Sequence, residues 1–131
     1  MRTKRKAKEE SLQISVSKYL RLQYPNTIFT AESSGIRLTM GQAVKAKKQR
    51  STHKQLDLWI LEPRGKYHGL IIELKKDGES PFKKKDGTLK AGEHLSDQYC
   101  TIQLLKYKGY AACFSVGFDQ TKTIIDDYMR M

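Results

Sequence analysis

Hydrophobic and polar residues recur with two different periods along the chain. Three- and four-residue spacing of apolar side chains predicts helices, and short β-branched or alternating runs predict strands. In chain order we expect a helix at 9–24, a strand at 27–31, strands at 56–61 and 69–75, a helix at 95–108, a strand at 110–116 and a helix at 119–131. This α-β-β-β-α-β-α order predicts an α/β fold with helices packed on a mixed central sheet.

Two long stretches lack a strong core pattern. Residues 33–54 are polar and basic, with a weak helical pattern at 40–48, and residues 76–94 are rich in lysine and glycine. We expect residues 33–54 to be a long mobile segment, because long loops in compact domains usually serve a function or a partner. Residues 1–8 are expected to be a basic tail and residues 9–131 a single domain.

The strands at 56–61 and 69–75 are joined by a turn-rich connection, which predicts a hairpin. With the turn centred on Gly65, Trp59 faces Ile71 and Asp57 faces Glu73. Both faces of this hairpin are then apolar, so its strands are expected to be covered on both sides. Side chains directly opposed across strands have Cβ atoms roughly 4.5–5.5 Å apart.

Two carboxylates at that separation repel each other, which predicts either a proton on one of them or a cation between them. Mg²⁺ is suitable because it takes one or two protein carboxylates and keeps positions for water and phosphate oxygens. Lys75 points to the same face as Glu73, since it lies two residues further along the strand. Its ammonium could orient or deprotonate an attacking water, or neutralise charge in the transition state. The structural alternative is an ordinary ion pair of Glu73 with Lys75 at the end of a strand.

The charge of the chain indicates a polyanionic partner. Lys and Arg total 25 against 14 Asp and Glu, a net charge of +11, and no acidic residue occurs between Ser33 and Leu56. Such segregation is typical of a phosphate-binding surface, although a generally basic protein is the alternative. The lysines that we expect to hold a DNA backbone are Lys45, Lys47, Lys48, Lys54, Lys83, Lys84, Lys85 and Lys90.

Other sequence features restrict the class of protein. No apolar run approaches the roughly 20 residues that a membrane span requires, and no secretory signal follows the basic start. Cys100 and Cys113 have apolar neighbours and are expected to be reduced core residues of an intracellular protein. No cysteine or histidine spacing predicts a zinc site.

Four short stretches resemble the PD-(D/E)XK nuclease superfamily, in particular its VRR-NUC branch, a small domain that occurs alone in phages and bacteria. QLD at 55–57 and IELK at 72–75 match the two halves of the PD-(D/E)XK motif, although Leu56 replaces the proline. GEHLSDQ at 92–98 is similar to the LSxxQ of the family, and EESLQ at 9–13 is similar to its opening ExxQ. The resemblance implies a restriction-endonuclease-like core.

The resemblance also implies a metal-dependent DNA endonuclease. Mg²⁺ or Mn²⁺ would be held by Asp57, Glu73, the backbone of Leu74 and Glu10, with Glu32 as a rival to Glu10. Lys75 would assist the attacking water, and Gln98 would support the placement of water or phosphate, unless Gln98 is only a solvated helix residue.

Stand-alone VRR-NUC proteins resemble Holliday-junction resolvases. This implies a cytoplasmic homodimer in a phage or bacterial host cell that cuts branched DNA. Residues 33–54, and an apolar face on the last helix at Ile124, Ile125, Tyr128 and Met129, could form the dimer. The alternative function is a non-catalytic nucleic-acid-binding module on the same fold.

Overall fold

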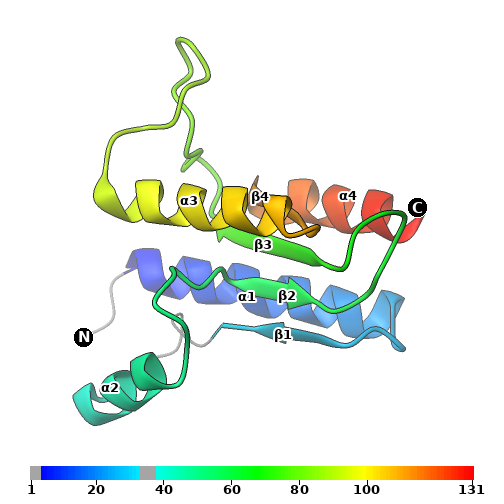
Figure 1. Ribbon diagram of the computed structural model, residues 1–131, viewed down its shortest axis with the longest axis horizontal. Helices are drawn as coiled ribbons and strands as arrows, with labels where there is room; N and C mark the ends of the chain where they lie inside the picture. The colour runs from blue at the N-terminus through cyan, green and yellow to red at the C-terminus, as the bar shows by residue number, and fades with distance from the viewer. Residues whose placement is uncertain (1–3, 33–37) are drawn as a thin grey trace.

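Four helices and four strands make up the described chain (Figure 1). The computed structural model describes residues 4–32 and 38–131, with only the backbone described for residues 4–10. The helices are α1 (Lys4–Gln23), α2 (Met40–Lys48), α3 (Glu93–Tyr107) and α4 (Gly117–Met129), and the strands are β1 (Phe29–Ala31), β2 (Leu58–Ile60), β3 (Leu70–Lys75) and β4 (Ala111–Val116). No helix in the described ranges has the length and apolar character needed to cross a membrane.

The strands form one mixed sheet in the order β1-β2-β3-β4. β1 and β2 are antiparallel, as are β2 and β3, whereas β3 and β4 are parallel, with α3 in the connection between them. The predicted register of the hairpin is confirmed, because Trp59 pairs with Ile71 and Leu58 with Ile72. Asp57 and Glu73 are therefore the next positions of the two strands, just beyond the end of the β2–β3 ladder.

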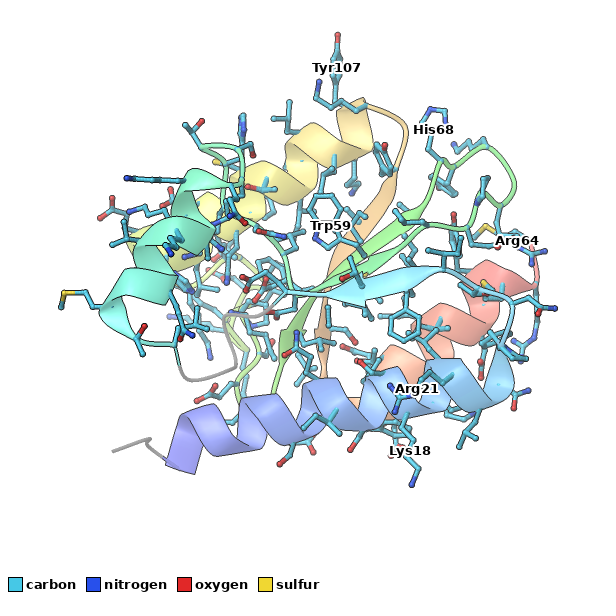
Figure 2. All side chains as sticks on the ribbon, turned by 90° about the horizontal axis from the view of Figure 1, so that it is seen from below. Lys18, Arg21, Trp59, Arg64, His68 and Tyr107 are labelled. Atoms are coloured by element: carbon cyan, nitrogen blue, oxygen red, sulfur yellow. The ribbon has the colours of Figure 1, made fainter. Side chains whose placement is uncertain are left out.

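Both faces of the sheet are covered, as the apolar hairpin predicted. On one face Leu58 and Ile72 pack with Val16 of α1 and Ile125 of α4. On the other face Ile71 packs with apolar residues of α3. Figure 2 shows Trp59 between the sheet and α3, in agreement with its place in the second cluster. Full burial of each such side chain contributes roughly 1.5–3 kcal/mol relative to exposure, so β3 is fixed firmly on both sides.

In chain order the helix α2 comes between β1 and β2, so the predicted order of elements is wrong at this point. Residues 38–48 are therefore not a mobile loop. Thr39 and Gln42 form a capping box at its N-terminus, and three lysines occupy its last turn. Caps and favourable charges stabilise a helix without burial, and α2 buries none of its residues. Residues 33–37 lie outside the described part of the chain.

The apolar face of α4 packs inside its own subunit, so the prediction that it is available for a dimer is wrong. Ile125, Tyr128 and Met129 are 8% exposed or less and belong to the core shared with α1, with Ile124 packed against them. Nearby, the Asp126 carboxylate accepts hydrogen bonds from the tyrosine hydroxyls of Tyr19 and Tyr24 on the α1 side, at 2.5 and 2.7 Å. These contacts join the first and last helices.

The two cysteines differ in their surroundings. Cys113 on β4 is partly buried and packs against the core, whereas Cys100 on α3 is exposed. The prediction of a core position for Cys100 is wrong because the stripe of α3 that faces the sheet contains Gln98, Ile102 and Leu105.

Candidate active site

Two carboxyl groups meet where β2 begins and β3 ends. Glu73 lies on the central strand β3 and is 5% exposed, and Asp57 directly precedes β2. The backbone N–H of Leu74 donates to Oδ2 of Asp57 at 2.8 Å. The carbonyl of Asp57 accepts from the N–H of Glu32 at 2.7 Å, which ties the end of β1 to the same point. The backbone of three strands thus fixes the position of Asp57.

Burial makes both acids hard to ionise, and the charge of Asp57 adds to this effect at Glu73. Burial raises the pKa of Glu73, and the charge of Asp57 and a hydrogen bond shared with it raise the pKa further, while Lys75 and Lys54 oppose the rise. Burial also raises the pKa of Asp57, against the hydrogen bond from Leu74. When no proton is shared between Glu73 and Asp57, the buried Oε1 of Glu73 has no hydrogen-bond partner in the described part of the chain. A cation at this oxygen would supply the positive partner that the described side chains do not.

Lys75 and Gln98 form a network beside these acids. The Lys75 ammonium donates to Oε1 of Gln98 at 2.9 Å, and Nε2 of Gln98 donates to Oε2 of Glu73 at 2.9 Å. Nζ of Lys75 is 3.9 Å from the same Glu73 oxygen. His94, one turn before Gln98 on α3, has Nε2 at 3.1 Å from Nε2 of Gln98. Gln98 therefore fixes both the amine and the carboxyl group through one side-chain amide.

The site opens into a cleft of about 760 Å³. Its walls carry basic and polar groups from residues 50–55 and from α3, including Lys54 and His94. Arg50 donates to the buried carboxylate of Glu32 at 3.0 Å on one side of the cleft. The helix α2 and the long connection between β3 and α3 project from the body of the molecule on either side of this end of the sheet (Figure 1).

The structure brings together four of the predicted site residues, Asp57, Glu73, Lys75 and Gln98. The side chain of Glu10 lies outside the described residues, although its backbone belongs to α1. Glu32 lines the cleft and is 9% exposed. Among the described residues, no group of three or more His, Cys, Asp and Glu side chains is arranged to hold a metal ion.

All eight predicted DNA-binding lysines are exposed or only partly buried. Lys47 and Lys54 line the cleft, and Lys45 and Lys48 share the last turn of α2 with Lys47. Lys83, Lys84, Lys85 and Lys90 lie in the projecting connection between β3 and α3 and do not line the cleft.

Sequence reasoning missed His94 and Arg50 at the site, and it matched Gln13 to the ExxQ of the family without giving it a role. Gln13 of α1 donates through Nε2 to the carbonyls of Glu32 and Asp57, at 2.8 and 3.3 Å. A signal for Gln13 exists, since it falls at helical spacing with the core residue Val16 and is a polar residue on an apolar stripe. The contacts of His94 and Arg50 had no comparable signal, because periodicity reports the face of an element and not its partner.

Comparison with solved structures places this fold beside a nuclease-related domain. The chain is similar to a structure named "VRR_NUC domain protein", with 25% sequence identity and a TM-score of 0.64 over 94% of this chain and 88% of that chain. No family model matches the sequence, and no curated protein matches it. The four-stranded mixed sheet with its helices is thus VRR-NUC-like, which supports the resemblance seen in the sequence at the level of this domain.

Proposed function

We propose that this protein is a metal-dependent endodeoxyribonuclease that hydrolyses phosphodiester bonds. The observation that carries the proposal is a pair of adjacent buried carboxyl groups, one with an unpartnered oxygen, next to a fixed ammonium group. They line a cleft in a chain with a net charge of +11. Buried acids that resist ionisation, close to a charge partner and in a cleft, are typical of functional sites.

The residues present fit Mg²⁺ or Mn²⁺. Asp57 and Glu73 would hold the ion with the backbone carbonyl of Leu74, and water and phosphate oxygens would complete its coordination. Glu32 is the described acid that could add a ligand, and it would first have to leave Arg50. A bound divalent ion would lower the pKa of a water ligand and polarise the phosphoryl group.

The side chains around the ion have separable roles in this proposal. The Lys75 ammonium would orient the attacking water, or neutralise charge that develops on the phosphate oxygens as the new P–O bond forms and the old one breaks. Gln98 would hold Lys75 and Glu73 in fixed relation through its amide. Gln13 would hold the backbone of Asp57.

The proposed substrate is DNA bound by its backbone. Lysines occur on α2 and on the β3–α3 connection, two segments that project on either side of this end of the sheet (Figure 1), so both segments can contact phosphates of one duplex arm. Phosphate contacts position the nucleic acid without reading its sequence, so selection would come from the shape of the DNA. Branched DNA is the form that we propose, because the resemblance to stand-alone VRR-NUC proteins implies it.

The alternative is a non-catalytic nucleic-acid-binding module on the same fold. Labelled duplex, flap and four-way junction should be incubated with the purified protein in Mg²⁺, Mn²⁺ or EDTA. Cleavage within strands with either metal, and none in EDTA, supports the nuclease. Tight binding with no cleavage under any condition would favour the module, which has no use for opposed buried acids.

The basic side chains of the β3–α3 connection should govern the salt dependence of DNA binding. Replacement of Lys83, Lys84 and Lys85 by alanine should flatten the slope of log affinity against log salt by about one unit for each phosphate that is no longer neutralised, and by about three at most. The matched control replaces three lysines away from the cleft, Lys18, Lys66 and Lys108. Equal slopes for the two triple variants would show that only net charge matters.

We further propose a homodimer that cuts four-way junctions in preference to linear duplex, since two matched cuts require two sites with two-fold symmetry. The exposed side chains of Met40 and Val44 on α2, at 86% and 47%, offer an apolar contact.

Light scattering should give about twice the 15.1 kDa of one chain. Met40→Ser with Val44→Ser should yield monomers, whereas Leu22→Ser, at a residue 73% exposed on α1, should not. A monomeric wild-type protein with equal rates on junction and duplex would contradict the resolvase-like role and leave the nuclease intact.

A further inference from the structure

The connection between β3 and α3 contains a short ordered hairpin, here called the finger, at residues 81–90. Phe82 and Leu89 form a β-bridge, and the backbone N–H of Lys83 donates to the carbonyl of Thr88 at 2.7 Å. At the tip, the Asp86 carboxylate accepts from the N–H of Thr88 at 3.0 Å and from its hydroxyl at 2.7 Å. The lysines of the finger are therefore carried by a folded unit and not by a chain without internal contacts.

The finger is fixed to the sheet by its base. Pro81 is fully buried, and its carbonyl accepts from the N–H of Lys90 at 2.8 Å. The ring of Phe82 meets the ring of Phe114 edge to face, with centroids 5.8 Å apart and an interplanar angle of 85°. Aromatic pairs favour this geometry. Phe114 lies on β4 directly beside Glu73 in the parallel ladder.

The same Phe114 ring also contacts the proposed catalytic amine. Nζ of Lys75 lies over this ring, 5.7 Å from its centroid, which is within the range of a cation–π interaction. Together with the Gln98 oxygen at 2.9 Å and the Glu73 oxygen at 3.9 Å, the ring gives the ammonium a third contact. The Lys75 side chain is only 14% exposed, so these contacts replace most of its water.

We infer that Phe114 is a positioning residue that holds the Lys75 ammonium toward the reacting phosphate, and that Phe82 couples the seating of the finger to it. This inference rests on the proposed function, because it assigns Lys75 a role in cleavage. One ring, Phe114, contacts both the DNA-binding finger and the amine. When DNA phosphates attract the finger lysines and displace the finger, the displacement passes through the Phe82–Phe114 contact to the Lys75 side chain, which faces the scissile bond.

Replacement of Phe114 by leucine tests the inference, since it removes the aromatic face and keeps an apolar side chain. The rate of single-turnover cleavage at saturating metal should fall by about 3- to 30-fold, which corresponds to the range of a cation–π contact, while DNA affinity changes by less than the rate. Phe114→Tyr should restore the rate. Phe29→Leu makes the same change on β1, at the far edge of the sheet, and should cleave as the wild type does.

A nuclear magnetic resonance measurement reads the contact without cleavage. With ¹³C-labelled lysine, the ε-methylene protons of Lys75, assigned with Lys75→Arg, should be shifted upfield by the Phe114 ring and lose that shift in Phe114→Leu. An upfield shift of the Lys75 protons in a protein that does not cleave DNA would mean that the contact exists and that the proposed function is wrong. Cleavage and methylene shifts unchanged by Phe114→Leu would overturn the inference.

Phe82→Leu separates the finger from the amine. If Phe82 couples them, this variant should retain the upfield shift of Lys75 in the free protein, and DNA should no longer alter that shift. The rate at saturating DNA should fall toward that of Phe114→Leu, with DNA affinity changed by less than the rate. If DNA still alters the Lys75 resonance to the same extent, or the wild-type resonance does not respond to DNA, the coupling through Phe82 is excluded.

Discussion

Glu73→Gln is expected to abolish DNA cleavage while the protein remains folded. The change keeps the shape of the side chain and removes the charge that would bind the metal ion, so the rate should fall by roughly 10³-fold or more, the upper end for loss of one charge-stabilising group. Glu93→Gln, at an exposed position in the first turn of α3, makes the same change in charge and should cleave normally. Cleavage by Glu73→Gln at near the wild-type rate would remove Glu73 from the site.

The same substitution should change how stability depends on pH in the absence of metal. In the folded protein the pKa of Glu73 is raised from an ordinary 4.5 to about 10 by burial and by Asp57. Between these values the folded state binds more protons than the unfolded state, so the free energy of unfolding falls as pH rises through this window. Glu73→Gln cannot ionise, and its unfolding free energy should decline less between about pH 5 and pH 9. Urea titrations at both pH values would measure this difference, and identical declines would contradict the buried acid pair.

Lys75→Ala should retain DNA and metal binding and lose cleavage rate by roughly 10²–10⁴-fold, the usual range for a group that transfers a proton or stabilises charge. The loss should appear in single-turnover rates at saturating metal and DNA. Lys76→Ala is the matched control, because the adjacent Lys76 pairs with Glu79 at 3.5 Å and lies outside the cleft lining. A collapse of metal affinity with a normal rate at saturating metal would make Lys75 a structural residue.

The sheet and the acidic end of the hairpin could be predicted because their signals are local. The turn centred on Gly65 fixes the pairing of Trp59 with Ile71, and a one-residue slip would turn every side chain to the other face. That register carries Asp57 to the level of Glu73. The short helix α2 was only weakly visible, since it has no apolar stripe, and its capping residues Thr39 and Gln42 were the better signal.

Other features of the site could not be predicted because they depend on contacts between distant segments. The ion pair of Arg50 with Glu32 joins the segment after α2 to the end of β1, and neither segment carries a signal for the other. The approach of Lys75 to Phe114 depends on the pairing of β3 with β4, which a single sequence does not specify. The position of Leu56 is a related case. Strand alternation would put Leu56 on the same side of the hairpin as Leu58, but Leu56 packs with Ile71 and Ile102, because regular pairing begins only at Leu58.

The wide separation along the chain of the groups in the cleft has a consequence for biosynthesis. The hydrogen bonds that fix them join residues 17, 25 and 44 positions apart, and β3 lies between β2 and the later strand β4. A chain still emerging from the ribosome holds Asp57 and Glu73 before Gln98 and β4 exist to fix them. If the protein is a nuclease, the incomplete chain would not cleave nearby nucleic acid during synthesis. Cleavage activity would begin only when β4 and α4 have packed onto the rest of the core.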